Sequence, residues 1–507
     1  MAAGESIDFI VIGCGAAGSE LANRLSANPA TSVLVLEAGG AASDPDIADI
    51  GGVVRLWGSA LDWKFSTQAQ PALGGRQIML NQGKVVGGGT SINAMMWVRG
   101  NRRNFDRWTA LGADGWSYEA VLPYYKDLED FEGGASEYHG VGGPISVRIC
   151  PDAAVRSEEF LVGVTELGYD GPHWDYNGER QENGAGLLHF HITKDGRRCS
   201  AAVAFLDPIR GRSNLTLKTG AEVTRLLIEG KRAVGVEYQQ DGQTYQVRAD
   251  REVIVSAGAL QSPKLLMLSG IGPAEQLRKH GFPVVVDLPG VGQNLQDHVQ
   301  VQFAFRTKTA RPNPQLLTGN ILFVNTRTST PNAPPDMQLL FTPAVPMPLS
   351  SVMNYGGPAC IFNAILVQPE SVGAVGLRSA NPLDPPIINP NYLQAQADVE
   401  TFLETLKLVR KIAGTRAFAD LNSGELAPGS ADPAAYIRAQ ASTLWHPAGT
   451  CKMGRGANAV VDPQLRVHGV EALRVIDASV MPTVISGNIV AGCYLIGARG
   501  ADMILAG

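Results

Sequence analysis

The C-terminal part of the chain holds a histidine and an asparagine whose side chains suit proton transfer. His446 lies in a turn between Trp445 and Pro447, and Asn488 follows a Ser-Gly pair farther along the chain. A neutral imidazole accepts a proton near neutral pH. An amide can donate a hydrogen bond to a developing oxyanion without titrating. Because an isolated histidine is more often structural, a catalytic assignment depends on the segments that accompany this pair.

A glycine-rich turn near the N-terminus predicts a dinucleotide site. Residues 7–12, IDFIVI, favour a buried parallel strand, and GCGAAG follows with Gly13, Gly15 and Gly18. A helical pattern and a second buried strand at 33–36 come next, ending in Glu37. The glycines permit a tight turn, close approach of a pyrophosphate and helix packing. The Glu37 carboxylate can accept from ribose hydroxyls and would repel a 2′-phosphate, which disfavours NADP and leaves FAD and NAD open.

A second glycine-rich stretch covers residues 83–106, GKVVGGGTSINAMMWVRGNRRNFD. Consecutive glycines let backbone amides come close to a ligand. Thr90, Ser91 and Asn93 can hydrogen-bond the edge of a planar ring. A triple glycine alone is more often an ordinary turn. Together with the dinucleotide motif and the His446–Asn488 pair, it indicates a segment that passes beside a flavin ring.

The intervening patterns predict how these motifs are positioned. Helical periodicity covers residues 118–131, residues 264–268 and residues 398–412, and a final helix is expected to begin at Asn488 as its cap. Residues 133–152 are rich in glycine, which predicts a loop. Residues 215–260 predict a small antiparallel sheet and a return strand at 253–256 into the nucleotide domain. Residues 300–390 predict a sheet-based lobe over the substrate side. Trp57 and Trp63 are expected in the core.

Composition excludes several classes of function. The 507 residues carry a net charge of −6 with no basic block, which argues against nucleic acid as a partner. The apolar runs are too short for a membrane span. Six cysteines are scattered without CxxC spacing, as expected for reduced thiols. No signal peptide is visible before the first predicted strand, so we expect a cytoplasmic protein.

Two histidines at His189 and His191 share one face of a possible strand. A metal site is conceivable there, but no third ligand is evident, and ordinary polar strand residues are the favoured interpretation. We therefore predict no metal.

Together, these motifs resemble those of the glucose–methanol–choline (GMC) oxidoreductases, a family of FAD-dependent alcohol oxidases and dehydrogenases. The resemblance covers essentially the whole chain. It is carried by GCGAAG with Glu37, GKVVGGGTSINAMMWVRG, GALQSPKLLMLSGIG, PGVGQNLQDH, WHPAGTCKMG, DASVMP and SGN. The pattern is most similar to the bacterial branch that includes sorbose dehydrogenase, choline dehydrogenase and hydroxymethylfurfural oxidase.

The resemblance implies an α/β fold. A doubly wound, Rossmann-like FAD-binding domain is expected at residues 1–150, 198–297 and 440–507. It is interleaved with an α+β substrate-binding domain, built on an antiparallel sheet, at residues 151–197 and 298–439.

The resemblance also implies the site residues. His446 matches the catalytic histidine of the family and Asn488 matches its partner. Apart from the resemblance, Trp445 precedes the base and is either a wall of the pocket or a packed core residue. Should His446 not be the base, His298 and His468 are the next candidates. The cofactor-binding residues are expected to be Gly13, Gly15, Ala16, Ala17, Gly18, Glu37, Val86, Gly88, Gly89, Asn93, Ala94, Met95, Val223, Asp477, Ala478 and Ile489.

The expected activity is oxidation of an alcohol, either a primary alcohol or a sugar-like polyol. A hydride passes from the alcohol carbon to flavin N5 while His446 takes the hydroxyl proton. The acceptor is O2 or a quinone-like or dye molecule, so both oxidase and dehydrogenase activity remain open. One alternative is an FAD-containing lyase of the hydroxynitrile-lyase type, without redox turnover. Another is a binding protein without turnover, which the intact His446 and Asn488 disfavour.

The chain departs from its relatives near the flavin. Many relatives have Thr-Asn-Leu-Pro after the asparagine, whereas Ile489-Val490-Ala491-Gly492 stand here, and Arg499 replaces a common glutamate. The expected contact at Ile489 therefore depends on its backbone. Some choline-oxidising relatives attach FAD through a histidine at the position of Ile92, whose side chain has no nucleophilic atom. We therefore predict non-covalent FAD.

Overall fold

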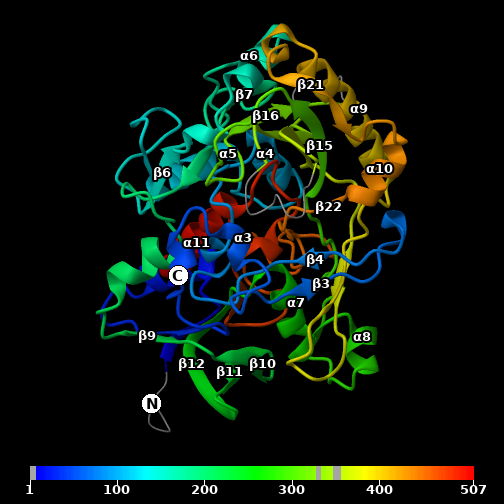
Figure 1. Cartoon of the computed structure of the whole chain (residues 1–507). Helices are drawn as coiled ribbons and strands as arrows, with labels where there is room; N and C mark the ends of the chain where they lie inside the picture. Colours follow the sequence, from blue (N-terminus) through cyan, green and yellow to red (C-terminus); the bar gives the residue numbers. More distant parts are fainter. Residues whose placement is uncertain (1–6, 327–332, 346–354) are drawn as a thin grey trace.

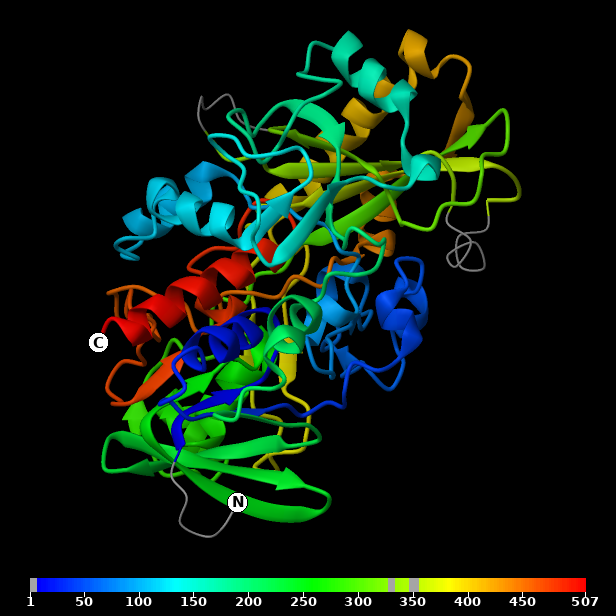
Figure 2. The ribbon, with the colours of Figure 1, turned by 90° about the vertical axis from the view of Figure 1, so that its left-hand side faces the viewer.

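The computed structural model describes residues 7–326, 333–345 and 355–507 of the chain. Its elements form two regions, each built on a seven-stranded sheet. One sheet lies next to the N-terminus and the other at the opposite end of the molecule (Figure 1, Figure 2). Residues 1–6, 327–332 and 346–354 lie outside the described residues. The first stretch belongs to the predicted nucleotide segment, and the other two belong to the predicted substrate segment 298–439.

The first sheet carries the predicted dinucleotide motif. Its strand order is β10-β11-β12-β1-β2-β9, with β23 beside β12. β1, β2, β9 and β23 belong to its parallel part, whereas β10, β11 and the start of β12 pair antiparallel. The buried strands expected at 7–12 and 33–36 are confirmed as β1 and β2. The bounds are β1 (Ile7–Ile12), β2 (Val33–Leu36), β9 (Leu215–Lys218), β10 (Glu222–Glu229), β11 (Arg232–Gln240), β12 (Gln243–Val255) and β23 (Leu473–Val475).

β12 joins the two parts of this sheet. Its first half pairs antiparallel with β11, and its second half pairs parallel with β1. The predicted return strand is therefore the end of one long strand, which contains no glycine or proline to break it. The prediction that LTLKT belongs to the antiparallel part was wrong, because β9 lies parallel to β2.

The second sheet is antiparallel, with the strand order β21-β15-β18-β17-β16-β7 and β22 beside β15. Alternate residues of its strands point to opposite faces. One face, which includes Val301, Phe303 and Phe362, packs against the helix α9 (Gln396–Ala413) in a hydrophobic core. The bounds are β7 (Gly184–Leu187), β15 (Val299–Thr307), β16 (Asn320–Val324), β17 (Met337–Thr342), β18 (Ala359–Leu366), β21 (Asn422–Ala427) and β22 (Ser442–Thr443).

The helices surround both sheets. The first helix packs closely on the last, because a Cβ added at Gly497 would lie only 2.8 Å from the Ala17 Cα atom. No helix among the described residues is both long and apolar enough to cross a bilayer. The helices are α1 (Ala16–Leu25), α2 (Pro45–Ala48), α3 (Val53–Leu56), α4 (Arg102–Ala110), α5 (Tyr118–Leu128), α6 (Glu158–Glu166), α7 (Gly258–Leu268), α8 (Ala274–Lys279), α9 (Gln396–Ala413), α10 (Pro433–Gln440) and α11 (Val490–Leu505).

Several predicted bounds change in the structure. The helix expected at 398–412 is confirmed as α9, but the one expected at 118–131 ends at Leu128. Residues 129–131 form a strand that pairs with Ile145–Ile149, inside the predicted loop. Tertiary pairing therefore overrides the helical pattern there. The helix expected at 264–268 begins earlier, at Gly258.

The prediction that Asn488 caps the last helix was wrong. α11 begins at Val490, its N-cap is Ile489, and no side chain caps it. The Asn488 amide instead faces His446 and Gln338, which satisfy it from outside the helix.

Candidate functional site

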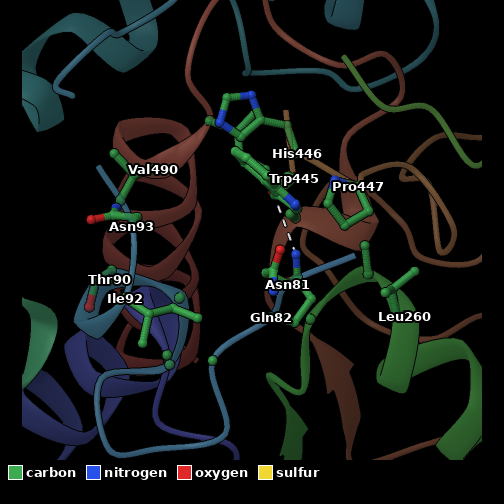
Figure 3. Close-up of a pocket in the computed structure, with 18 of the residues that line it drawn as sticks. Asn81, Gln82, Thr90, Ile92, Asn93, Leu260, Trp445, His446, Pro447 and Val490 are labelled. Atoms are coloured by element: carbon green, nitrogen blue, oxygen red, sulfur yellow. Dashed lines mark hydrogen bonds between the residues drawn. The ribbon is translucent and has the colours of Figure 1, made fainter. Parts of the chain in front are cut away.

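A cavity of about 680 Å³ extends from the dinucleotide motif to the second sheet. Figure 3 shows Thr90, Ile92 and Asn93 on one side of it, Leu260 and Pro447 on the other, and Trp445 with His446 at the upper end. Most of the predicted site residues line this cavity. They are Gly13, Gly15, Ala16, Ala17, Glu37, Gly88, Gly89, Asn93, Ala94, Met95, Val223, Trp445, His446, Asp477, Ala478, Asn488 and Ile489.

Two predicted residues, Gly18 and Val86, do not line the cavity. A Cβ added at Gly18 would lie 2.0 Å from the Gly13 carbonyl oxygen, so this glycine permits α1 to pack on the turn. The Val86 side chain is buried in the core of the first region. Val86 therefore supports the glycine-rich turn from behind.

The glycines at the nucleotide end leave the backbone open to a ligand. A Cβ added at Gly15 would meet no atom closer than 4.0 Å, and one at Gly89 would meet none within that distance. Both residues line the cavity. Gly13 has a φ of +89°, and a Cβ there would lie 2.5 Å from the Ser256 carbonyl oxygen, so the tight turn requires glycine. The start of α1 lies at this turn, where a helix N-terminus favours phosphate.

Glu37 lines the cavity and also supports the dinucleotide turn. Its carboxylate accepts from the Cys14 backbone N–H at 3.1 Å and from the Gly39 backbone N–H at 2.8 Å. Burial raises the pKa of this carboxyl, although these hydrogen bonds oppose the shift. Glu37 therefore has a structural function in addition to the ribose contact that the sequence predicts.

The second glycine turn is held by its own polar side chains. The Thr90 hydroxyl donates to the Gly87 carbonyl at 2.6 Å, and the Ser91 hydroxyl donates to the Val86 carbonyl at 2.8 Å. These hydroxyls were expected to bond a ring edge; in the structure they close the turn instead. The turn therefore presents mainly backbone to the cavity.

Asn93 is likewise fixed by neighbouring side chains. Its Oδ1 atom accepts from the Met95 N–H at 3.0 Å and from Arg198 Nη1 at 2.8 Å. Its Nδ2 atom lies 3.2 Å from His191 Nε2. His191 Nδ1 lies 2.8 Å from the Cys199 carbonyl, and since a carbonyl can only accept, Nδ1 carries the proton and Nε2 accepts from Asn93. His191 is thus a buried residue that orients Asn93.

The His189-Phe190-His191 strand is confirmed as β8 (His189–His191). His189 is buried beside the rings of Phe131 and Tyr176. Within residues 7–326, 333–345 and 355–507, no three His, Cys, Asp or Glu side chains come together in an arrangement that could hold a metal ion.

His446 lies between an asparagine and a second histidine. Its Nε2 atom is 3.5 Å from Asn488 Nδ2, and its Nδ1 atom is 2.9 Å from His298 Nδ1. Burial, and then the nearby His298, lowers the pKa of His446 well below 6.5. Burial also lowers the pKa of His298 to about 3. Both imidazoles are therefore neutral at neutral pH, and His446 can accept a proton.

The orientation of Asn488 is set by a residue of the second sheet. Gln338 Nε2, on β17, donates to Asn488 Oδ1 at 3.0 Å. Asn488 therefore directs its Nδ2 donor toward His446 Nε2. Gln338 was not predicted, because only the fold brings β17 close to the start of α11.

The turn that carries His446 is anchored by Asp297. Its Oδ1 atom accepts from the His446 backbone N–H at 2.8 Å, and its Oδ2 atom accepts from the Thr443 hydroxyl at 2.6 Å and from the Tyr392 hydroxyl. Burial raises the pKa of Asp297 to about 6. Asp297 and His298 thus hold the backbone and the side chain of His446, respectively. His468, the other alternative base, lies outside the cavity and contacts the Gly454 carbonyl.

Trp445 lines the cavity as a wall next to His446. Its φ of 61° is unusual for a residue with a bulky side chain. The ring packs on Trp57 with centroids 4.5 Å apart, and Gln82 Nε2 donates to the Trp445 carbonyl at 3.5 Å (Figure 3). Trp57 and Trp63 were expected in the core; both pack against buried hydrophobic clusters, but they are partly exposed and also line the cavity.

Asp477 lies at the nucleotide side of the cavity, and its carboxylate is engaged by the protein. It accepts from the Gly258 N–H at 2.9 Å and from the Ser262 hydroxyl at 2.5 Å. It also accepts from the Ser479 N–H at 2.8 Å. Burial raises its pKa. Asp477 therefore joins β23 to the start of α7 and leaves backbone atoms to face a ligand.

The substrate end contains residues that the motifs did not identify. Gln300 and Gln302 of β15 and Asn363 of β18 line the cavity. The sequence VQVQFAF alternates apolar and polar residues from Val299 onward, so a two-faced strand was recognisable there. That its polar face borders the cavity depends on the sheet.

Comparison with known proteins identifies the family to which the chain is similar. Two family models, both described as GMC oxidoreductase, match residues 7–300 and 369–497. Mitochondrial choline dehydrogenase of Homo sapiens is 40% identical, and the match covers 99% of this chain and 90% of that protein. Oxygen-dependent choline dehydrogenase of Brucella anthropi is 37% identical, with 98% and 95% covered.

Solved structures show the same fold. Pyridoxine 4-oxidase from Mesorbium loti superposes with a TM-score of 0.91 at 32% identity, covering 98% of this chain and 99% of that one. A variant of formate oxidase from Aspergillus oryzae, in a study of FAD modification, gives a TM-score of 0.89 at 27% identity, covering 99% and 98%.

Proposed function

Since the chain belongs to the GMC oxidoreductase family, we propose that it is an FAD-dependent alcohol oxidoreductase with His446 as the general base. The observation that carries this proposal is the His446–Asn488 pair. Its two facing nitrogens, 3.5 Å apart, share one cavity with the glycine-rich turns at Gly15 and Gly89. The similarity to choline dehydrogenases and to pyridoxine 4-oxidase supports a small alcohol as the substrate.

The residues of the cavity fit FAD. The open backbone at Gly15 and the start of α1 suit the pyrophosphate. Glu37 and Val223 line the adenosine end, and the turn at Gly89 leads toward His446. When bound, the flavin supplies the redox chemistry by accepting a hydride from the alcohol carbon at N5. The start of α11 also lines the cavity and offers its positive end to negative charge there.

The hydrogen bonds around His446 favour one tautomer. Asn488 Nδ2 can only donate, so the facing Nε2 atom of His446 presents its lone pair. The His446 proton then lies on Nδ1 and is donated to His298 Nδ1. In turn, His298 carries its own proton on Nε2, which is buried. His298 is therefore proposed to keep His446 in the tautomer whose basic nitrogen faces the cavity.

The pair can act on one substrate oxygen. A separation of 3.5 Å is long for a direct hydrogen bond, so a hydroxyl oxygen can approach both nitrogens. His446 Nε2 accepts the hydroxyl proton, and Asn488 Nδ2 donates to the oxygen as negative charge develops. Trp445 and Trp57 keep this end of the cavity apolar on one side.

Anaerobic mixing with alcohols tests the proposal. The FAD-loaded protein is mixed with primary alcohols, aryl alcohols and polyols while the flavin absorbance is recorded. Bleaching by at least one alcohol is expected, and repetition in air with peroxide detection separates O2 from a quinone-like acceptor. A flavin that stays oxidised while the protein cleaves a cyanohydrin would overturn the redox proposal in favour of a lyase.

A further inference from the structure

The face of the second sheet that borders the cavity bears amide side chains. On β15, Gln300 and Gln302 point toward the cavity, while the alternate residues Val301 and Phe303 point into the core. Asn363, on β18, stands directly opposite Gln302 in the antiparallel ladder. We call Gln300, Gln302 and Asn363 the amide face.

Two amides of the amide face are fixed by hydrogen bonds within the protein, whereas the third has none to any described residue. Gln300 Nε2 donates to the Thr443 carbonyl at 2.7 Å, which fixes Gln300 Oε1 as the acceptor for Asn363 Nδ2 at 2.7 Å. Within the part of the chain that the structure describes, the Gln302 amide has no protein hydrogen-bond partner. Its donor and acceptor are therefore available to a ligand in the cavity.

Charged groups line the other end of the cavity. Among the described residues, the lining carboxylates and lysine all belong to the nucleotide side: Glu37, Glu222, Lys264 and Asp477. Asp297, behind His446, does not line the cavity and is covered by donors.

Aromatic faces can also attract ammonium groups. Trp57, Trp445, Tyr355 and Tyr436 line the cavity, and Trp57 and Trp445 cover one face of each other with centroids 4.5 Å apart. An aromatic face attracts a cation more weakly than a full negative charge does. The Tyr436 ring stacks on Phe303 of β15. A cationic substrate would lose its hydration without gaining an opposite charge, which is unfavourable.

We infer that the substrate is an uncharged alcohol with at least one further hydrogen-bonding group, which the amide face binds. This inference rests on the proposed function and deepens it. It also separates this chain from relatives named for choline, whose quaternary ammonium group is permanently charged. A site built to hydrogen-bond a substrate group discriminates strongly against analogues that lack the group.

A pair of nearly isosteric alcohols tests the charge selection. Choline and 3,3-dimethylbutan-1-ol have similar shapes and differ by the charge. Anaerobic flavin reduction of the FAD-loaded chain should give a kcat/KM for the neutral alcohol at least equal to that for choline. A choline advantage of threefold or more would overturn the inference. If neither compound reduces the flavin, that failure counts against the proposed function alone. Calorimetric titration then measures the binding constants of both compounds and decides whether the cavity prefers the neutral one.

Gln300→Glu tests whether the amide face sets this preference. A carboxylate at this position should favour choline. The kcat/KM for choline, divided by the kcat/KM for 3,3-dimethylbutan-1-ol, should rise at least tenfold, and the ratio of binding constants should rise likewise. Gln243→Glu, at an exposed site in the β11–β12 hairpin, adds the same charge outside the cavity and should leave the ratio unchanged. Asn363→Asp serves as the second variant where Gln300→Glu does not fold. A ratio that stays constant in a folded variant would contradict the inference.

Gln302→Leu tests the second hydrogen-bonding group. The wild-type chain should favour butane-1,4-diol over butan-1-ol at least tenfold in kcat/KM, because the second hydroxyl can reach a polar partner. The variant should reduce this preference to threefold or less. Equal preference in both proteins would show that the amide face does not bind the substrate.

Discussion

The Nδ1 atoms of His298 and His446 lie 2.9 Å apart, with the two rings nearly perpendicular at 85°. Two neutral imidazoles can share this contact only if one nitrogen donates and the other accepts. The proton of His446 therefore has a partner on the side away from the cavity, while its Nε2 atom faces Asn488. This relationship links the proposed base to a residue that does not line the cavity.

His298→Leu tests the positioning role of His298. Loss of the acceptor for His446 Nδ1 should lower kcat/KM for flavin reduction by about tenfold to a hundredfold, less than the hundredfold to ten-thousandfold that a positioned base contributes. His298→Asn retains an acceptor and should recover part of the rate. A rate loss that His298→Asn does not recover, with FAD still bound, would indicate a purely structural role.

The pH dependence of the wild-type chain follows from the neutral imidazole. The base is active when unprotonated, so activity is lost as the pH falls through the pKa of His446. Burial and His298 lower this pKa well below 6.5. The acid limb of kcat/KM for flavin reduction should therefore have its midpoint below pH 6.5. A midpoint above 6.5 would mean that His446 is more solvated than the structure indicates or that another group is the base.

Glu37→Arg tests the adenosine end of the cavity. The substitution removes the predicted ribose acceptor and the two backbone hydrogen bonds that the carboxylate accepts in the turn. FAD retention should fall at least tenfold, measured as the flavin-to-protein ratio after gel filtration. Glu37→Gln keeps an acceptor oxygen and should retain more FAD. Unchanged retention in Glu37→Arg would place the adenosine elsewhere.

Acid precipitation tests how FAD is held. Ile92 lines the cavity and offers no nucleophile at the position where some relatives carry a histidine. Cys493 also lines the cavity, but burial raises the pKa of its thiol to about 12, which keeps the thiol protonated. All the yellow colour should pass into the filtrate after denaturation. Flavin that remains on the precipitate would refute non-covalent binding, and Cys493→Ser would be the first variant to examine.

Local motifs predicted the parts of the site that depend on local backbone. The Gly13 and Gly88 turns, Glu37 and the strand at residues 7–12 follow from residue types within a few positions of one another. The amphipathic helix α9 was recognisable for the same reason. These features can be predicted without knowing which distant segments come into contact.

The remaining parts depend on contacts between distant segments. Gln338 reaches Asn488 only because β17 lies beside the start of α11, and this contact replaced the predicted helix cap. Likewise, Thr90 and Ser91 bond their own turn, which sequence alone did not distinguish from bonding a ligand. The strand at residues 129–131 continues a helical pattern and forms only because it pairs with residues 145–147.

Anaerobic flavin reduction by His446→Ala tests the central claim most directly. The variant and the wild-type chain are loaded with FAD, their spectra are matched, and both are mixed with the same alcohol in a stopped-flow instrument. A positioned base contributes about a hundredfold to ten-thousandfold to rate, so the reduction rate should fall by that factor while FAD stays bound. A His446→Ala protein that reduces its flavin at nearly the wild-type rate would contradict the assignment of His446 as the base.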